Sequence, residues 1–265
     1  MSNSILTKKI LYWYDNNKRV LPWRKKISQT KKEYYTLVSE FMLQQTQVAT
    51  VIPYFNNFIR DIPNLISLSK ISDSKLLKYW EGLGYYSRVK NLKKTAQLIE
   101  LKFKGRLPRN INELKSLPGI GDYTSNAIMA IAFNKPFIPL DGNIERVIKR
   151  VLNLKLAHEV SKENLIKEKK ILGTSIRSSD YAQALMELGA LICRPKNPLC
   201  SQCPLTKYCK SFKKDDFEIP KQSKKNNNKF YLVEVYKKNN QFLLIKNTKF
   251  SFLKNLKIFP MKQIS

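Results

Sequence analysis

Four cysteines within one short block constrain this chain more than any other feature of its sequence. The chain has 265 residues and contains no further cysteine. The four are spaced C-x6-C-x2-C-x5-C, as Cys193, Cys200, Cys203 and Cys209. Residues 1–13 lack the continuous apolar segment of a secretory signal. Because disulfide frameworks belong to exported chains, we expect these thiols to bind a metal centre instead.

The spacing of the thiols bears on which metal centre they hold. Zinc and iron–sulfur clusters both accept four thiolates. Structural zinc sites usually pair two short knuckles, whereas only Cys200 and Cys203 are so closely spaced here. The wider flanking loops suit a bulkier cluster, with zinc as the alternative. Lys207 and Lys210 lie in the same block, and we expect them to lower the pKa of the thiols.

The charge of the chain points to its partner. It carries 49 Lys and Arg against 20 Asp and Glu, a formal net charge of +29. This excess suits a polyanion, although a compositional bias toward Lys and Asn is the alternative source. The longest apolar run, residues 127–133, is far shorter than the roughly 18 residues of a membrane-spanning helix. We therefore expect a soluble, cytoplasmic protein that binds nucleic acid and no membrane.

Hydrophobic periodicity predicts a mainly helical chain. Apolar residues recur at helical spacing between residues 5 and 130, and Asp73 is the expected cap of one helix. Residues 213–229 are rich in Lys and Asn and are expected to form a linker. Beyond them, residues 230–236 and 242–245 alternate or cluster apolar side chains and predict a β-hairpin.

Two glycine-rich turns are compatible with DNA contact. Residues 117–121 read LPGIG between two predicted helices. Gly119 and Gly121 would allow positive φ and close backbone approach, and the following helix would present free amides to a phosphate. Residues 80–86 read WEGLGYY, which would expose Tyr85 as a wedge for a base stack. A tight helix–helix turn and ordinary core packing are the respective alternatives.

Seven segments, in order along residues 13–209, carry a family resemblance. They read WYDNNKRVLPWR (13–24), SEFMLQQTQVATVIPYF (39–55), WEGLGYYSRVKNL (80–92), LPGIGDYTSNAI (117–128), PLDGNIERV (139–147), ALMELGALIC (184–193) and the cysteine block. Together they resemble the MutY family of adenine DNA glycosylases, in the helix-hairpin-helix superfamily that includes endonuclease III. The resemblance implies an all-α fold of two helical domains with an iron–sulfur loop, and a [4Fe–4S] cluster on the four cysteines.

The resemblance also implies domain boundaries. Residues 1–29 and 136–212 would form the cluster domain, and residues 30–135 a six-helix barrel with the helix-hairpin-helix. Residues 213–229 would be the linker, and residues 230–265 a shortened part of the family's Nudix-like β domain. Because that domain reads 8-oxoguanine in the family, we expect adenine excision with a weaker preference for 8-oxoguanine over guanine.

The catalytic mechanism of the family implies roles for four residues of this chain, which are Glu40, Asp141, Tyr123 and Asn143. Glu40 aligns with the general acid that protonates N7 of adenine, and Asp141 with the carboxylate that stabilises the oxocarbenium-like sugar. Apolar neighbours such as Leu37, Phe41 and Leu43 would raise the pKa of Glu40. Tyr123 stands where bifunctional relatives have a lysine nucleophile, so strand cleavage is not expected. In the family this tyrosine hydrogen-bonds the catalytic aspartate.

Asn143 matches another partner of that aspartate. The structural alternatives are a solvated carboxylate for Glu40, a helix cap for Asp141 and a core aromatic for Tyr123.

The resemblance assigns the remaining residues to two sets. The adenine pocket would be lined by Arg19, Trp23, Arg24, Leu43 and Gln183. DNA contacts would come from Gln45, Tyr85, Gly119, Gly121, Arg194 and Lys196.

The expected function is therefore monofunctional adenine excision in base excision repair. The expected partner is double-stranded DNA with adenine opposite 8-oxoguanine or guanine, bound by a monomer at the bacterial nucleoid. A thymine or other mismatch glycosylase and a catalytically inactive DNA-binding scaffold are the alternatives. The intact pair of Glu40 and Asp141 argues against the scaffold.

Overall fold

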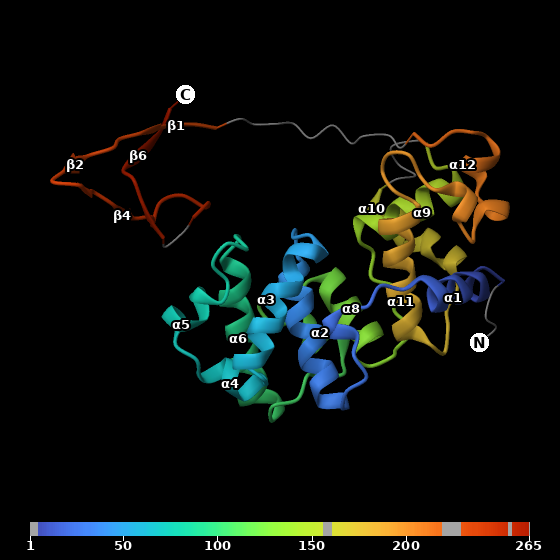
Figure 1. Ribbon diagram of the computed structural model, residues 1–265, viewed down its shortest axis with the longest axis horizontal. Coiled ribbons are helices and arrows are strands. Elements are labelled where there is room, and N and C mark those ends of the chain that lie inside the picture. Colours follow the sequence, from blue (N-terminus) through green and yellow to red (C-terminus); the bar gives the residue numbers. More distant parts are fainter. Residues whose placement is uncertain (1–4, 156–160, 219–228, 254–255, 265) are drawn as a thin grey trace. The chain divides into compact units, whose positions relative to one another are not determined.

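The computed structural model describes residues 5–155, 161–218, 229–253 and 256–264. The chain divides into two compact units, Met1–Pro220 and Lys221–Ser265. The first unit is helical and the second contains short strands (Figure 1). No helix in the described part of the chain is long and apolar enough to cross a membrane. Met1–Ser4 and most of the predicted linker lie outside the described residues.

One hydrophobic core of the helical unit surrounds α2 (Gln29–Leu43), which is buried along most of its length. Large side chains such as Phe41, Phe55, Phe58 and Trp80 are fully enclosed there. The surrounding helices are α3 (Val48–Asp61), α4 (Leu65–Lys70), α5 (Asp73–Lys78), α6 (Ser87–Phe103), α7 (Ile111–Lys115) and α8 (Asp122–Ile131). Burial on several sides of α2 holds its functional side chains in a rigid setting.

A second core joins the N-terminal helix to the later part of the unit. Here α1 packs on α11, so residues far apart in sequence share one hydrophobic cluster. The helices of this core are α1 (Ile5–Asn17), α9 (Gly142–Leu152), α10 (Lys162–Glu168), α11 (Ser178–Glu187) and α12 (Lys210–Lys213). Short helical turns occur at Pro22–Arg24, Lys169–Leu172, Leu188–Ile192, Cys200–Gln202 and Thr206–Tyr208. The predicted domain boundaries stay predictions; like the two hydrophobic cores, they group the N-terminal segment with the later part of the helical unit.

The helix limits follow from side-chain caps. The Ser72 side chain accepts a hydrogen bond from the Lys75 amide at the start of α5. The prediction that Asp73 is this cap was wrong, because Asp73 is already the first helical residue. There its carboxylate lies near the positive end of the helix macrodipole. Asn110 caps α7 by accepting from the amides of Asn112 and Glu113.

The turn between α7 and α8 contains the LPGIG motif. Gly119 has a φ of +79°, and an added Cβ there would lie 2.8 Å from the Phe41 ring. Gly121 has a φ of −95° and open space around its Cβ position. The expectation of positive φ is therefore confirmed for Gly119 and wrong for Gly121. Both glycines are exposed, so the turn and the first amides of α8 form a free surface.

The strands of the second unit are paired differently from the prediction. They are β1 (Phe230–Val233), β2 (Lys237–Lys238), β3 (Gln241–Phe242), β4 (Ile245–Lys246), β5 (Lys257–Ile258) and β6 (Met261–Ile264). A hairpin does join β2 to β3 through two asparagines with positive φ, Asn239 and Asn240, which is the backbone that such tight turns require. However, β1 pairs with β6 and not with residues 242–245, and β4 pairs with β5.

Candidate active site

The residues predicted for catalysis and for the adenine pocket line one cavity of about 550 Å³ in the helical unit. They come from the N-terminal segment and from α2, α8, α9 and α11, which belong to both hydrophobic cores. The predicted residues that line it are Arg19, Trp23, Arg24, Glu40, Leu43, Tyr123, Asp141, Asn143 and Gln183. The fold therefore brings together side chains up to 164 positions apart in the sequence. A single mixed polar and apolar cavity of this size is typical of a small-molecule or base-sized ligand.

Glu40 lies in the last turn of α2, inside the cavity wall. Its side chain is buried, which excludes the alternative of a solvated helix carboxylate. Burial raises the pKa of Glu40 from 4.5 to about 7, as its apolar neighbours led us to expect. One carboxyl oxygen, Oε2, has no hydrogen-bond partner among the described residues. Glu40 can therefore hold a proton near neutral pH and present an unpaired oxygen to a ligand.

Tyr123 lies in the first turn of α8 and hydrogen-bonds the Glu40 side chain. Burial and the nearby carboxylates raise the pKa of Tyr123 well above its usual value, so the phenol stays neutral and donates. The resemblance led us to expect this hydrogen bond on Asp141. The structure instead gives it to Glu40, and Asp141 acts on Tyr123 through its charge.

Asp141 precedes α9 and combines two arrangements that the sequence left as alternatives. Its Oδ1 accepts from the Ile144 amide at 2.7 Å, so Asp141 is the helix cap. Its Oδ2 accepts from Asn143 Nδ2 at 3.2 Å, which agrees with the predicted partnership. Burial raises the pKa of Asp141, and these two hydrogen bonds oppose that rise. The carboxylate is therefore held in one orientation at the cavity wall.

Arg146 connects this carboxylate to the start of the cysteine block. Its Nη2 donates to Asn143 Oδ1 and to the Gly189 carbonyl, both at 2.7 Å. Its Nε donates to the Cys193 carbonyl at 2.7 Å. A Cβ on Gly189 would lie 2.6 Å from Asn143 Cβ, so the two segments are in direct contact. The position of Asn143, and through it Asp141, thus depends on the loop that contains Cys193.

Arg19 and Arg24 share a carboxylate that sequence reasoning did not single out. Glu187 is fully buried and accepts from Arg19 Nε at 3.0 Å and from the Arg19 backbone amide at 3.1 Å. Arg24 Nη1 forms a second ion pair with the same carboxylate. The signal available in the sequence was an acidic residue inside the otherwise apolar segment 184–193. This buried carboxylate orients both arginines beside the cavity, and Arg24 Nε has no hydrogen-bond partner in the part of the chain that the structure describes.

The remaining residues of the predicted adenine pocket are held by packing and by one hydrogen bond. Trp23 makes an edge-on contact with Phe55, with ring centroids 5.2 Å apart. Leu43 is half-buried at the end of α2. Gln183 is buried and donates from Nε2 to the Ser179 carbonyl at 3.0 Å. These contacts give the cavity an ordered wall beside the arginines.

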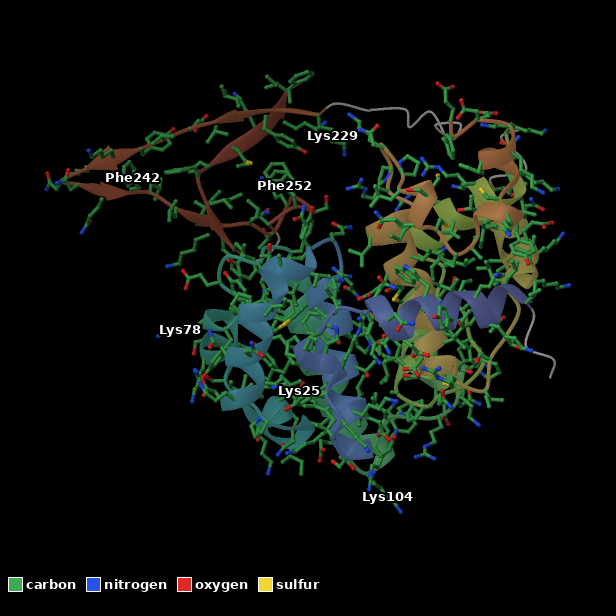
Figure 2. All side chains as sticks on the ribbon, turned by 45° about the vertical axis from the view of Figure 1, so that its right-hand side comes forward. Lys25, Lys78, Lys104, Lys229, Phe242 and Phe252 are labelled. Carbon is green, nitrogen blue, oxygen red and sulfur yellow. The ribbon has the colours of Figure 1, made fainter. Side chains whose placement is uncertain are left out.

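The six predicted DNA-contact residues lie outside the cavity wall and are exposed. Tyr85 is 62% exposed with a φ of +47°, and Gln45 is exposed with a φ of +58°. Gly119 and Gly121 occupy the turn before α8, and Arg194 and Lys196 the loop after Cys193. Exposed non-glycine residues with left-handed backbone are uncommon and often mark functional positions. Other lysines, such as Lys25, Lys78 and Lys104, are distributed around the helical unit (Figure 2).

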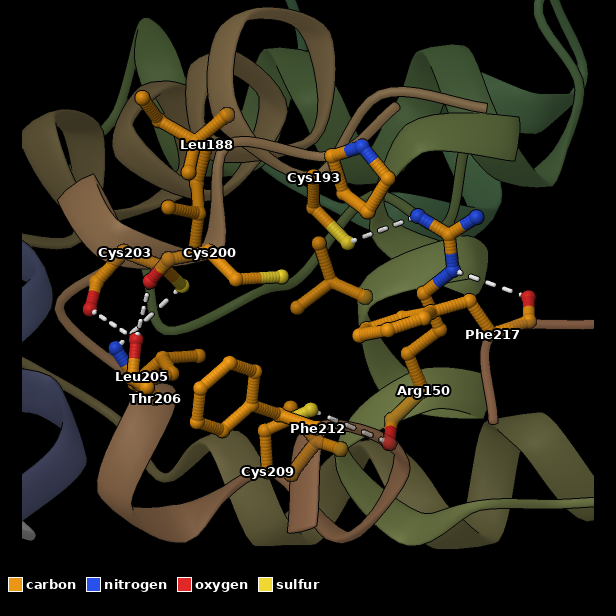
Figure 3. Close-up of a pocket in the computed structure, with 14 residues that line it drawn as sticks. Arg150, Leu188, Cys193, Cys200, Cys203, Leu205, Thr206, Cys209, Phe212 and Phe217 are labelled. Atoms are coloured by element: carbon orange, nitrogen blue, oxygen red, sulfur yellow. Dashed lines mark hydrogen bonds between the residues drawn. The ribbon is translucent and has the colours of Figure 1, made fainter. Parts of the chain in front are cut away.

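All four cysteines line a second pocket of the helical unit (Figure 3). The pocket also contains Arg150, whose Nη1 donates to Cys193 Sγ at 3.6 Å. The Leu205 amide donates to Cys203 Sγ at 3.4 Å. Burial raises the pKa of Cys203 to about 11, so the expected lowering by Lys207 and Lys210 was wrong. Arg150 is the cation that most favours the ionised form of Cys200 and Cys209, and burial outweighs it.

The four thiols in this pocket are a donor set that fits a thiolate-bound metal centre. Among the residues that the structure describes, no three Cys, His, Asp or Glu side chains meet closely enough to hold a single ion. The four thiols are instead distributed over the walls of one pocket with apolar neighbours such as Val151, Leu188 and Ile192. Four thiolate donors around one shared pocket are a donor set that an iron–sulfur cluster uses.

Comparisons with known proteins show the family to which this chain belongs. Residues 38–170 match the family described as HhH-GPD superfamily base excision DNA repair protein. The adenine DNA glycosylase of Buchnera aphidicola from Baizongia pistaciae is 38% identical over 254 residues, which cover 96% of this chain and 67% of that protein. Its counterpart from Schizaphis graminum is 38% identical over 275 residues, covering 98% of this chain and 76% of that protein.

A solved structure supports the fold independently. A thermostable thymine-DNA glycosylase superposes with a TM-score of 0.70 at 27% identity, over 80% of this chain and 97% of that one. The predicted all-α fold and the predicted family are therefore confirmed. The chain belongs to the HhH-GPD superfamily of base excision DNA repair proteins, among the members named adenine DNA glycosylase.

Proposed function

We propose that the protein is a monofunctional adenine DNA glycosylase that removes adenine mispaired with 8-oxoguanine or guanine. The observation that carries the proposal is the cavity in which buried Glu40, with a pKa near 7, shares a wall with Asp141. The activity named for the relatives supports the same substrate class. Hydrolysis of an N-glycosidic bond needs a proton on the departing base and negative charge beside the developing sugar cation.

Glu40 is the proposed proton donor. Adenine leaves poorly as an anion, so protonation of its N7 weakens the bond between N9 and the sugar. The unpaired Oε2 of Glu40 is available for this transfer, and the neutral phenol of Tyr123 keeps the carboxyl group in place. Because the pKa of Glu40 is near neutrality, a large fraction of the enzyme carries the proton at physiological pH.

Asp141 is the proposed stabiliser of the sugar cation. Its capping bond to Ile144 and its bond from Asn143 leave the carboxylate fixed, so little reorganisation accompanies charge development. Water then adds to the sugar carbon and passes one proton to the Glu40 carboxylate, which restores the acid and leaves an abasic site. Tyr123 cannot form the imine by which a lysine at this position cleaves the strand, so the backbone stays intact.

Base recognition is assigned to the remaining cavity residues. The arginine pair held by Glu187 offers donors, and Trp23 and Leu43 offer flat apolar contact for a purine ring. Gln183 adds a buried amide group to the same wall. A base must leave the duplex to enter this cavity, and extrusion is least costly at a mispair.

DNA is the proposed macromolecular partner, bound by a monomer in the cytoplasm at the nucleoid. Tyr85 and Gln45 would enter the base stack, and the amides after Gly119 and Gly121 would contact phosphates. Arg194 and Lys196 would add phosphate contacts. The net charge of +29 would strengthen binding to any duplex and make it sensitive to salt.

The four cysteines are the proposed ligands of a [4Fe–4S] cluster. Iron–thiolate bonds would tie the loop that contains Cys193 to the loop that contains Cys209. The Arg150 guanidinium would offset part of the negative charge of the cluster. Because Arg146 joins the Cys193 carbonyl to Asn143, the role we propose for the loop is structural and positional.

The decisive experiment uses a duplex with adenine opposite 8-oxoguanine, incubated with the purified protein and then with or without alkali. Breakage of the adenine strand only after alkali is the expected result for a monofunctional enzyme. Breakage without alkali would contradict the assignment of Tyr123, and no breakage in either arm would contradict adenine excision. Matched duplexes with a T·G pair test the thymine glycosylase alternative, to which the structural neighbour gives weight.

A further inference from the structure

Arg88 is a buried cation with no carboxylate partner in the described part of the chain. It lies in the first turn of α6 and is only 6% exposed. Its guanidinium donates instead to backbone carbonyls, and burial lowers the pKa of this group. The two terminal nitrogens are satisfied in this way, whereas the buried Nε has no hydrogen-bond partner among the described residues. A buried guanidinium is costly unless its donors are satisfied, so the contacts of the two terminal nitrogens favour one position of the side chain.

The carbonyls that accept from Arg88 belong to two separate segments. Nη1 donates to Phe41, Met42 and Gln44 at 3.2, 2.7 and 2.5 Å, at the carboxyl end of α2. Nη2 donates to Leu83 and Gly84 at 3.0 and 3.2 Å, in the turn before α6. The last carbonyls of a helix lack intrahelical partners, and the helix macrodipole favours a cation there. One side chain therefore joins the end of α2 to the turn of residues 80–86.

In each of the two segments that Arg88 joins, the residue after an accepting carbonyl is exposed and has a left-handed backbone conformation. Gln45 follows the Gln44 carbonyl directly and has a φ of +58°. Tyr85 follows the Gly84 carbonyl directly and has a φ of +47°, and its ring lies 5.6 Å from the Arg88 guanidinium carbon. Such conformations persist only where the surrounding contacts enforce them. Arg88 supplies part of those contacts at the carbonyls that precede both residues, and Trp80 Nε1 also donates to the Gly84 carbonyl at 3.2 Å.

We propose that Arg88 is a positioning residue that fixes the spacing between Gln45 and Tyr85, so that both can enter the base stack when the target nucleotide is extruded. The inference rests on the proposed function, since both residues are assigned there to the DNA stack. It adds a physical link between them and the helix that carries Glu40. Neither Lys nor Gln can replace the link, because neither presents the guanidinium's paired donors to two segments at once.

The test compares Arg88→Lys and Arg88→Gln with wild type on two duplexes under single-turnover conditions. In one duplex adenine is paired with guanine, and in the other it lies opposite an abasic-site analogue and has no pair to break. We expect both variants to lose about tenfold in excision rate on the paired duplex and to be nearly unchanged on the unpaired one. Arg60→Lys is the matched control, because Arg60 is exposed and its carboxylate contacts are with the adjacent Asp61.

Base extrusion is measured separately with 2-aminopurine in place of adenine. Its fluorescence rises when the base leaves the stack, whether or not the glycosidic bond is hydrolysed. We expect a smaller rise with Arg88→Lys than with wild type. If the wild type extrudes the probe and releases no adenine, the proposed function fails while the role of Arg88 is still measured.

Four results would overturn the proposal. An equal loss on both duplexes, or loss of helical circular dichroism in both variants, would assign Arg88 to general stability. Wild-type rates on the paired duplex would show that the spacing does not matter. If the losses in excision rate of Arg88→Lys and Tyr85→Ala simply multiply in the double variant, Arg88 does not act through Tyr85. Substitutions of two coupled residues are expected to be non-additive in free energy.

Discussion

Replacing Glu40 with glutamine separates the chemistry of the cavity from its effect on stability. The amide keeps the shape of the side chain and cannot deliver the proton. General acids contribute about 10²–10⁴-fold to rate, so we expect E40Q to lose at least about a hundredfold in adenine excision. Affinity for the mispaired duplex should stay close to that of wild type, because the proposed DNA contacts are on other segments.

The difference in stability between E40Q and wild type should depend on pH, because only wild type carries the titrating carboxyl group of residue 40. The pKa of Glu40 is raised from 4.5 to about 7 by burial. At about 1.4 kcal/mol per pKa unit, this shift amounts to about 3 kcal/mol. The folded state holds the proton more tightly than the unfolded chain does, so this stabilisation is full below pH 4.5. In wild type this stabilisation is lost as the pH rises through about 7. In E40Q there is no carboxyl group at residue 40, so this loss does not occur.

The assay is urea-induced unfolding followed by circular dichroism across this pH range. Relative to wild type, E40Q should gain about 3 kcal/mol in the free energy of unfolding between pH 4.5 and about 7. Glu113→Gln is the control, because Glu113 is exposed on α7 and its variant should follow wild type. A difference between E40Q and wild type that stays constant with pH would refute a raised pKa and with it the acid role.

Other changes test neighbouring parts of the site. Tyr123→Phe removes a hydrogen bond that lowers the pKa of Glu40, so the alkaline limb of the rate profile should move to higher pH; an unchanged limb would contradict the contact. Gly119→Ala should cost about 1–3 kcal/mol of stability, through its φ of +79° and the 2.8 Å approach to Phe41. Gly121→Ala, with open space, should keep stability and weaken DNA binding in filter assays. Cys203→Ala should lower the iron content and visible absorbance of the purified protein; equal iron in both proteins would remove this ligand.

Local patterns predicted the parts of the fold that depend on neighbouring residues. The helical periodicity around Glu40 requires only that one segment buries its apolar side chains, and α2 does so. The turn at Gly119 follows from a motif in which a side chain would collide with the Phe41 ring. The periodicity of α2 and the glycines of the turn are local features, whereas the Phe41 ring that excludes a side chain at Gly119 lies 78 positions away in the sequence.

Contacts between distant segments were not predictable in this way. Glu187 holds Arg19, 168 positions away, and nothing near either residue specifies the pairing. Arg88 binds carbonyls, which every residue carries, so sequence gives no sign of its partners. The pairing of β1 with β6 was missed for a similar reason, since short apolar strands specify register weakly.

The backbone itself separates the acid–base properties of the two proposed catalytic carboxylates. Burial raises the pKa of both, which alone would favour protonation of each. Glu40, however, lies in the last turn of α2, where the negative end of the helix disfavours its ionised form. Asp141 caps the first turn of α9, where the positive end and the Ile144 amide favour ionisation. A cap is therefore not an alternative to a catalytic role at Asp141, because the capping hydrogen bond favours the ionised carboxylate that the proposed role requires.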